Sequence, residues 1–246
     1  DLYLLGRHRL LCGDSTNITD VERLMDGKKA DMVFTDPPYN IGFGGSMSNT
    51  TVDGKMVKHK GANQKHEAIH NDKMDEGEFK QFILDILNTI RMYCEGAYYI
   101  TFGSQTLNQL LQPMHEADME YKSIIVWMKN QATLSGKDYK SRYEPIVYGR
   151  FNDGFYGTRY EQEDIWEIQR TLKNDLHPTM KPVPLVEKAL LNSSERGMCI
   201  LDLFLGSGST LIACEKTGRT CYGMELEPLY IQVCLDRWTK FTGKDP

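Results

Sequence analysis

A short turn holds the most unusual combination of residues in this sequence. The apolar run 32–34 favours a buried strand, and Asp36-Pro37-Pro38-Tyr39 follows it almost directly. The two prolines cannot donate hydrogen bonds to a strand ladder, so they end the strand, and their fixed φ angles stiffen the turn. A tight turn requires no tyrosine, and a core strand requires no aspartate. The segment therefore predicts a rigid turn that presents a carboxylate and an aromatic ring to a ligand.

A glycine turn follows a second apolar strand. The stretch ILDLFLGSGSTLIACEKTG (200–218) indicates strand, turn and helix, with Gly206 and Gly208 in the turn. It lacks the GxxxxGK[ST] pattern of triphosphate loops, and Leu211 stands at the third glycine position of GxGxxG. Two glycines alone are also compatible with an ordinary turn. The next strand, however, ends in Glu225, which can accept the hydroxyls of a ribose. Together they favour a nucleoside cofactor without pyrophosphate, such as S-adenosylmethionine.

Strands and helices are expected to alternate along the chain. Apolar runs predict strands at 9–14, 30–35, 97–102, 121–128, 198–204 and 220–225. Helical spacing predicts helices at 19–25, 79–90, 105–117, 180–191, 209–218 and 227–241. Thr19 with Glu22 resembles a capping box, and Gly96 is a candidate C-terminal stop. This order predicts an α/β fold with a mostly parallel twisted sheet and helices on both faces.

The predicted sheet brings separate parts of the chain to one edge. Ligands of such sheets bind beyond the carboxyl ends of the strands. We therefore expect Asp14, Asp36, Phe102 and the segment 202–204 to lie along the same edge.

Length and composition predict a single domain. The 246 residues are 40% hydrophobic, and no Pro/Ser/Gly-rich linker or low-complexity tract divides them. No apolar run approaches the roughly 18 residues of a membrane span. The first residue is Asp1, which is consistent with a processed or excised piece of a longer protein. Six cysteines without a CxxC pair predict reduced core thiols of a cytoplasmic protein.

Charge is distributed unevenly. The net charge of −5 by itself disfavours a polyanionic partner. Between residues 41 and 66, however, four lysines accompany one acid, and between 122 and 150 six basic residues accompany two acids. Each segment is compatible with a solvated surface. Two of them in an acidic chain leave room for a face that contacts phosphates.

Four motifs, taken in their order along the chain, resemble those of one enzyme family. The DPPY segment 36–39 and FLGSG (204–208) look like the paired catalytic and cofactor motifs of the exocyclic-amino DNA methyltransferases. DPPY before FxGxG resembles the permuted beta group of that family. HPTMKP (177–182) resembles the HPTxKP segment, and LLCGDS (10–15) resembles the strand that delivers an acid to the cofactor's adenine. The resemblance covers nearly the whole chain and implies a Rossmann-like, S-adenosylmethionine-dependent methyltransferase fold. The first 14 residues also resemble a junction in phage-type methylases that carry a domain upstream.

Roles for individual residues follow from these motifs and the resemblance. The expected catalytic residues are Asp36, Pro37, Pro38 and Tyr39. The expected cofactor contacts are Asp14, Asp36, Thr179, Lys181, Asp202, Phe204, Gly206, Ser207, Gly208, Thr210, Glu225 and Leu226. The expected DNA contacts are Asn40, Lys55, Lys58, Lys60, Lys129, Lys140 and Arg142. Asp14 could instead cap the following helix, and Lys181 could pair with a surface acid. The chemistry requires no metal, and no His, Cys or Asp cluster has ligand spacing.

The reaction of this family explains the residue types in the DPPY turn. An exocyclic amino group is a poor nucleophile because its lone pair is delocalised into the ring of the base. Asp36 and the Pro37 carbonyl could accept its hydrogens and draw the nitrogen toward a pyramidal geometry. Tyr39 offers a flat face for a base extruded from the duplex.

The target base is expected to be adenine. DPPY resembles the N6-adenine members, whereas cytosine-N4 members more often carry SPPY, so N4 methylation of cytosine remains the alternative. Cytosine-C5 chemistry needs a nucleophilic Cys, usually in a Pro-Cys pair, and this sequence has no such pair. A protein-glutamine methyltransferase, with NPPY, fits less well. A non-catalytic relative would be expected to lose Asp36 or Tyr39.

Two segments are candidates for reading DNA. The polar, lysine- and glycine-rich stretch at about 41–75 is predicted to be a mobile insertion that faces DNA. The target-recognition segment of the family corresponds to about 130–175, and it is short here. A compact reader suggests a short site, or help from a second subunit of a homodimer or from an upstream domain. A partner nuclease is a further candidate partner. Double-stranded DNA is the expected partner, and no association with a membrane is expected.

Overall fold

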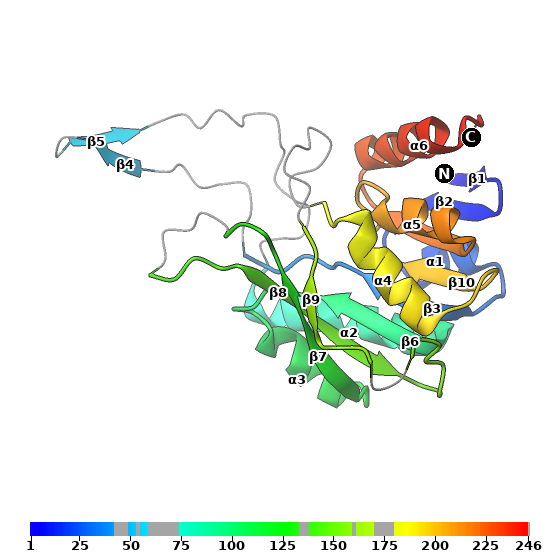
Figure 1. Cartoon of the computed structure of the whole chain (residues 1–246), viewed down its shortest axis with the longest axis horizontal. Coiled ribbons are helices and arrows are strands. Elements are labelled where there is room, and N and C mark those ends of the chain that lie inside the picture. Colours follow the sequence, from blue (N-terminus) through cyan, green and yellow to red (C-terminus); the bar gives the residue numbers. More distant parts are fainter. Residues whose placement is uncertain are drawn as a thin grey trace.

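The computed structural model describes residues 1–41, 74–132, 138–158, 161–169 and 180–245, and the backbone of 49–52 and 55–58. The strands of its main sheet are β1 (Leu2–Leu5), β2 (His8–Cys12), β3 (Ala30–Thr35), β6 (Cys94–Thr101), β7 (Tyr121–Met128), β8 (Tyr143–Arg150), β9 (Ile165–Glu167), β10 (Cys199–Asp202) and β11 (Thr220–Glu225). The helices are α1 (Ile18–Met25), α2 (Glu76–Tyr93), α3 (Asn108–Glu116), α4 (Val183–Ser193), α5 (Ser209–Thr217) and α6 (Pro228–Thr242). β4 (Asn49–Val52) and β5 (Lys55–Lys58) form a separate antiparallel pair (Figure 1).

The main sheet is mostly parallel, as predicted. Its strand order is β1-β2-β11-β10-β3-β6-β8-β7-β9, and the five neighbours from β2 to β6 run parallel. Only the pairings β1 with β2, β6 with β8 and β7 with β8 are antiparallel within this sheet. The carboxyl ends of the five parallel strands therefore meet at one edge, which we call the carboxyl edge. Asp14, Glu225, Asp202, Asp36 and Phe102 lie at or just beyond these strand ends.

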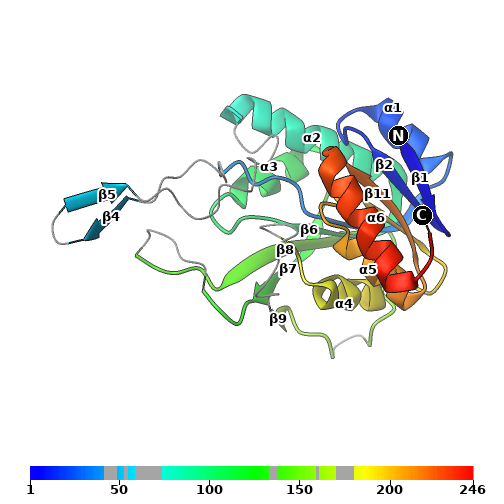
Figure 2. The ribbon, with the colours of Figure 1, turned by 90° about the horizontal axis from the view of Figure 1, so that it is seen from above.

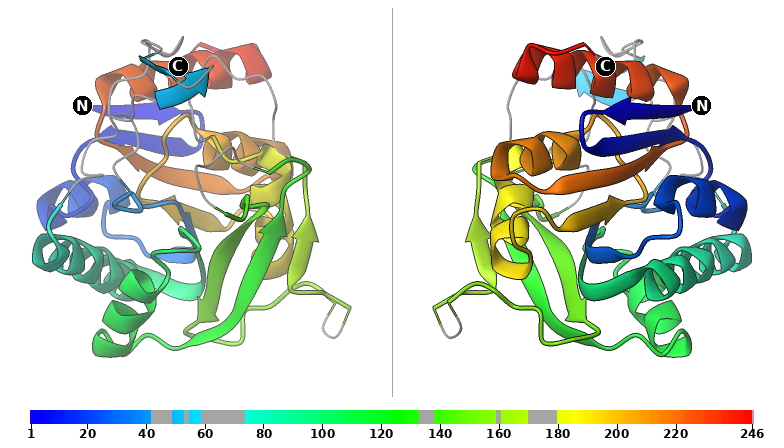
Figure 3. Two further views of the ribbon diagram at one scale, coloured as in Figure 1. Left: turned by 90° about the vertical axis from the view of Figure 1, so that its left-hand side faces the viewer. Right: turned by 90° about the vertical axis from the view of Figure 1, so that its right-hand side faces the viewer.

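Helices cover both faces of the sheet, which confirms the predicted layers. Figure 2 shows α1, α2 and α3 on one side and α4, α5 and α6 on the other. Two apolar clusters correspond to these layers, one with side chains from α1, α2 and α3 and the other with side chains from α4, α5 and α6. The two ends of the described chain lie close together beside β1 and α6 (Figure 3).

The ends of two helices differ from the prediction. Asn17, not Thr19, caps α1, because the Asn17 side chain accepts the backbone N–H of Thr19. α2 begins with a capping box of Asp75 and Glu78 and ends before Cys94, and Gly96 lies inside β6. A Cβ atom at Gly96 would lie 1.9 Å from the Asp31 carbonyl oxygen, so this glycine permits close approach of β3 and β6.

Three strands of the main sheet were not predicted, and neither were β4 and β5. β1 pairs with β2 at one edge of the sheet, β9 pairs with β7 at the other, and β8 lies between β6 and β7. Pro145 inside β8 weakens the strand signal of the sequence, although its residue pairs with Val126 in the sheet. The stretch 143–150 of the expected recognition segment therefore belongs to the main sheet, and the role of the segment in reading DNA stays a prediction.

The remaining predictions concern chemistry and the insertion. All six cysteines are free, as predicted. Among the described helices, none is long and apolar enough to cross a membrane. Apart from its first and last residues and the backbone of β4 and β5, the predicted 41–75 insertion lies outside the described residues.

Candidate active site

The carboxylate of Asp36 stands at the centre of a dense polar cluster. Its Oδ1 atom accepts hydrogen bonds from the Tyr39 hydroxyl, at 2.6 Å, and from the Thr101 hydroxyl. Its Oδ2 atom accepts one from the Lys181 ammonium at 2.6 Å. Asp36 follows β3, Thr101 ends β6 and Lys181 precedes α4, so three separate segments converge on one half-buried carboxylate. Charge-assisted hydrogen bonds of this kind hold a carboxylate in one orientation.

Lys181 is a buried cation within this cluster. Its Nζ atom also lies 3.1 Å from the Tyr39 hydroxyl and 5.4 Å from the centre of the Tyr39 ring. Burial alone would lower the pKa of Lys181, but the Asp36 and Glu144 carboxylates raise it well above its ordinary value. Lys181 therefore stays charged and pairs with the DPPY aspartate, and its contact with the cofactor stays a prediction.

Tyr39 lies against the end of β6. Its ring centre is 5.3 Å from that of Phe102, and the ring is half-buried. A Cβ atom at Gly103 would meet Tyr39 Cδ2 at 3.3 Å and the Thr106 hydroxyl oxygen at 2.7 Å, so the ring packs here only because residue 103 is glycine. Burial and the Asp36 charge raise the pKa of the Tyr39 hydroxyl well above its usual value, which keeps it neutral.

A second carboxylate extends the cluster away from Asp36. Glu144, at the start of β8, pairs with Lys129 just beyond β7, and its Oε2 atom lies 3.4 Å from the Lys181 ammonium. Burial alone would raise the pKa of Glu144, but Lys181 and Lys129 together lower it. Lys129 is buried, and its ammonium faces Glu144; its contact with DNA stays a prediction.

The glycine turn is held by backbone hydrogen bonds. Glu225 Oε2 accepts the Gly206 N–H at 2.7 Å, and Oε1 accepts the Glu227 N–H at 2.9 Å. Gly206 and Gly208 have φ angles of 53° and 83°, the left-handed region that favours glycine. The turn therefore depends on its glycines for shape and on Glu225 for position.

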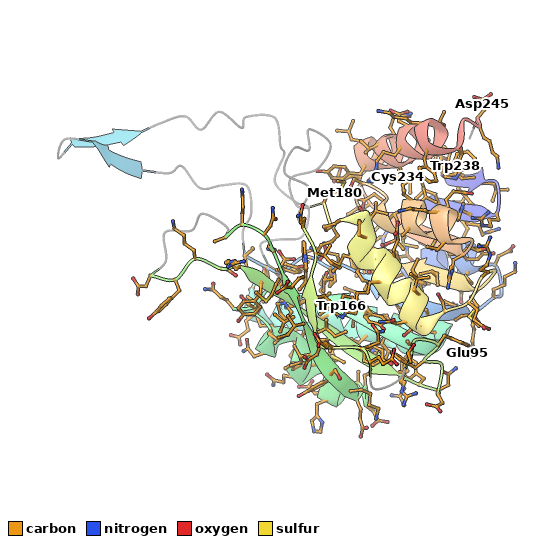
Figure 4. All side chains as sticks on the ribbon, in the orientation of Figure 1. Glu95, Trp166, Met180, Cys234, Trp238 and Asp245 are labelled. Carbon is orange, nitrogen blue, oxygen red and sulfur yellow. The ribbon has the colours of Figure 1, made fainter. Side chains whose placement is uncertain are left out.

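Two side chains of helix α6 form hydrogen bonds with the same turn. The Cys234 thiol donates to the Gly206 carbonyl at 3.2 Å, and the Arg237 guanidinium donates to the Ser207 carbonyl and, at 3.1 Å, to its hydroxyl. Figure 4 labels Cys234 on α6, next to α5. A Cβ atom at Gly208 would lie only 2.9 Å from the Cys234 sulfur. Arg237 had no sequence signal, because its contact joins segments that no motif connects.

Asp202 and Thr210 are hydrogen-bonded to each other next to the glycine turn. Both are buried, and the Thr210 hydroxyl donates to Asp202 Oδ2 at 2.6 Å. Asp202 Oδ1 accepts the Thr35 hydroxyl and the Phe204 N–H, so the carboxylate joins β3, β10 and α5. Burial raises the pKa of Asp202 to about 7. Both side chains therefore support the turn, and their contact with the cofactor stays a prediction.

The other expected cofactor residues lie along the carboxyl edge. Asp14 does not cap α1: its Oδ1 atom accepts the N–H and hydroxyl of Thr16 at 2.9 and 2.7 Å. Phe204 and Leu226 are half-buried beyond β10 and β11, whereas Ser207 is buried in the turn. Thr179 lies outside the described residues.

The expected DNA contacts separate into three groups. Asn40 uses its side-chain amide on the Met74 backbone, donating at 3.0 Å and accepting at 2.7 Å. It thus joins the two ends of the 41–73 segment, and its contact with DNA stays a prediction. Lys140 and Arg142 are exposed on the segment that leads into β8 and Glu144. The side chains of Lys55 and Lys58, and the whole of Lys60, lie outside the described part of the chain.

Comparison with known proteins gives these features a family. A family model described as DNA methylase, for N6 and N4 methyltransferases, matches residues 30–236. The type II methyltransferase M.HpaI of Haemophilus parainfluenzae is 25% identical over 261 residues, covering 96% of this chain and 76% of that protein.

Solved structures show the same fold. The cytosine-N4-specific PvuII DNA methyltransferase aligns with a TM-score of 0.70 and 15% identity, over 98% of this chain and 92% of its own. A putative DNA modification methylase from Thermus thermophilus, complexed with S-adenosyl-L-methionine, aligns with a TM-score of 0.64 and 22% identity, over 95% and 94%. The chain belongs to the N6/N4 DNA methylase family, whose members methylate exocyclic amino groups of DNA bases.

Proposed function

We propose that this chain transfers the methyl group of S-adenosylmethionine to the N6 amino group of an adenine flipped out of duplex DNA. The observation that carries the proposal is the Asp36 carboxylate, fixed by three donors at the same edge as the glycine turn. The Ser209 hydroxyl donates to the Lys181 carbonyl at 2.7 Å, which joins the lysine of this cluster to the first turn of α5.

The residues of the glycine turn fit a nucleoside cofactor. The backbone amides orient both oxygens of Glu225, and each oxygen retains a further lone pair for a ribose hydroxyl. The turn carries no lysine and no triphosphate pattern, which suits a cofactor without phosphates. Asp14 is half-buried beyond β2, and only its Oδ1 atom accepts hydrogen bonds within the described residues. Its Oδ2 atom is thus suited to an adenine amino group.

The groups around Asp36 suit transfer to an amino nitrogen. S-adenosylmethionine, when bound, supplies a methyl group that its sulfonium sulfur already activates. The amino nitrogen would take this methyl group with S-adenosylhomocysteine as the leaving group, and it would then release its extra proton to water. Asp36, with its two rigid prolines behind it, accepts an amino N–H and stabilises the positive charge that develops on the nitrogen. Positioning supplies much of the remaining acceleration.

The exposed face beside this cluster suits DNA. Tyr39 is half-buried, so part of its ring is open to a base that leaves the duplex. Lys140 and Arg142 are exposed and precede Glu144 by only a few residues, so they can contact phosphates next to the flipped base. A homodimer, an upstream domain and a partner nuclease stay predictions.

Nucleoside analysis tests the target base. The protein is incubated with S-adenosylmethionine and mixed-sequence duplex DNA, and the DNA is digested to nucleosides. N6-methyl-2′-deoxyadenosine in the digest supports the proposal, and N4-methyl-2′-deoxycytidine contradicts the choice of adenine. No methylated base, with cofactor binding intact, contradicts the DNA-modifying role and favours a protein substrate or a non-catalytic relative.

A further inference from the structure

Glu144 is a half-buried acid that none of the motifs assigns. It is the second residue of β8, a strand that the sequence did not predict, and its side chain is 21% exposed. Its two oxygens face two different lysines, Lys129 at the end of β7 and Lys181 before α4. Removing a carboxylate and two ammonium groups from water costs free energy, and close pairing between them is needed to offset that cost.

The two contacts of Glu144 differ in kind. Oε1 accepts a hydrogen bond from Lys129, whereas Oε2 makes no hydrogen bond within the described residues and faces the Lys181 ammonium at 3.4 Å. Glu144 thus acts on Lys181 through its charge. Lys181 in turn donates to Asp36 Oδ2 at 2.6 Å. The four groups form a line of alternating charge: Lys129, Glu144, Lys181 and Asp36.

The charges in this line cancel. Two carboxylates balance two ammonium groups, and Tyr39 remains neutral between Lys181 and Asp36. An amino nitrogen that receives a methyl group becomes positive next to Asp36, and a lone ammonium at Lys181 would oppose that charge. Glu144 cancels much of this opposition, because in a partly buried site like charges interact more strongly than in water.

We propose that Glu144 is a positioning residue of the methyl transfer: it fixes Lys181 against Asp36 and neutralises the ammonium, so that Asp36 keeps its stabilising charge for the reacting nitrogen. Lys129 holds Glu144 in place and completes the balance. This inference rests on the proposed function and adds to it two residues, of which Lys129 had been expected on DNA and Glu144 had no assigned role.

Single-turnover methyl transfer tests the charge balance. The variants are Glu144→Gln, Lys129→Met and the double variant, each with saturating S-adenosylmethionine and a duplex that carries the site methylated by the wild type. Glu144→Gln leaves a net positive cluster, and we expect the transfer rate to fall roughly 10- to 100-fold, the range for outer partners of metal ligands. The cofactor dissociation constant should not change. The double variant again balances Lys181 against Asp36, and it should recover much of the lost rate.

A matched control is available on the same side of the sheet. Glu187 on α4 is also partly buried and pairs with Lys216 at 2.7 Å, but it touches none of the four groups. Glu187→Gln should leave the transfer rate unchanged. A wild-type rate in Glu144→Gln, or a double variant no faster than Glu144→Gln, would overturn the inference and leave Glu144 a structural pair.

A readout without DNA separates this inference from the proposed function. Ion-paired lysine ammonium groups give ¹H–¹⁵N signals, which the Lys129→Met and Lys181→Met spectra assign. In Glu144→Gln the Lys181 signal should shift or vanish, and in Glu187→Gln it should stay. An unmoved Lys181 signal contradicts the inference. If the signal moves as expected but the wild type methylates no DNA, the ion pairs are as described and the proposed function, with the positioning role, is wrong.

Discussion

The two halves of the carboxyl edge are built from different interactions. In the glycine half, formed by β10, β11, α5 and α6, backbone amides and carbonyls of the turn 204–208 bind Glu225, Cys234 and Arg237. In the proline half, formed by β3, β6, β8 and the turn 36–39, ion pairs and hydroxyl groups converge on Asp36. Glycines shape the first turn, and prolines stiffen the second.

This difference matches two tasks. A turn held by its own backbone approaches a ligand closely and keeps its shape, which suits the binding of a cofactor. A half-buried carboxylate held by charged neighbours carries an electric field toward a reacting group, which suits catalysis. If this division is correct, substitutions in one half should change transfer, and substitutions in the other should change cofactor affinity.

The largest effect is expected from Lys181→Met. This variant leaves two carboxylates, Asp36 and Glu144, with Lys129 as their remaining ammonium partner among the described residues. Removing one partner of a buried ion pair costs about 3–5 kcal/mol, so the free energy of unfolding should fall by that order. Urea unfolding measures it. Lys216→Met, whose partner Glu187 lies on α4 and whose own side chain is half exposed, is the control, and equal losses in the two variants would contradict the central place of Lys181.

Two variants of Tyr39 should separate the contribution of ring stacking to DNA binding from that of the hydroxyl group. Stacking of a base on an aromatic ring contributes about 1–3 kcal/mol, so Tyr39→Ala should weaken binding of duplex DNA by that amount. Tyr39→Phe keeps the ring and its packing against Phe102, so its DNA affinity should stay close to wild type. Fluorescence titration with labelled duplex compares the three proteins. Equal losses in the two variants would indicate that the hydroxyl bond to Asp36, and not the ring, supports binding.

Gly208→Ala should affect the glycine half alone. A left-handed φ costs a residue with a Cβ atom about 1–2 kcal/mol, and this Cβ atom would also meet the Cys234 sulfur at 2.9 Å. Calorimetric titration should show weaker binding of S-adenosylmethionine. Gly27→Ala is matched in φ at 72° but has open space around its Cβ atom and lies away from the turn, so it controls for backbone strain. Equal cofactor affinity in Gly208→Ala and wild type would contradict the role of this turn.

The sequence predicted the glycine half better than the proline half. Gly206, Gly208 and Glu225 lie within one strand–turn–helix–strand unit, so their spacing revealed the arrangement. The partners of Asp36 come from distant strands, and no spacing connects Thr101 or Glu144 to it. The apolar runs likewise predicted the sheet. They did not predict β8, because Pro145 interrupts the strand pattern of its sequence.

Residue types alone did not reveal the internal partners of several side chains. Asp202, Lys129 and Asn40 carry the residue types expected for ligands, yet each is committed to a partner inside the protein. A charged or polar type predicts that a side chain needs a partner, but only the packing decides whether that partner is a ligand. Strand β8 and the hydrogen bonds between Asn40 and Met74 both depend on tertiary contacts, so no local pattern in the sequence predicted them.

The smallest effect concerns acid sensitivity, and it should arise at His8 in β2, outside both halves. His8 is fully buried, its Nδ1 atom accepts the Cys221 N–H at 2.9 Å, and Nε2 lies 2.7 Å from Glu215. Burial lowers the pKa of His8 despite the raising effect of Glu215. A lowered folded-state pKa gives stability that is present above the unfolded value, near 6.5, and is lost as pH falls toward the folded value.

The melting temperature should therefore fall on acidification below that value, and part of the fall should belong to His8. His8→Gln can still accept the Cys221 N–H but does not titrate, so its melting temperature should depend less on pH in this range. Identical pH profiles for the two proteins would show that His8 does not control acid stability. In the proline half, the lowered pKa of Glu144 keeps that group ionised across the same range.

Asp36→Ala tests the division between the halves most directly. Methyl transfer to duplex DNA and S-adenosylmethionine affinity are measured on the same preparation of this variant and of the wild type. The account predicts that transfer falls by at least roughly 10²- to 10³-fold, as for other preorganised charge-stabilising groups, while the cofactor still binds. Wild-type turnover in Asp36→Ala would contradict the catalytic role of the DPPY carboxylate.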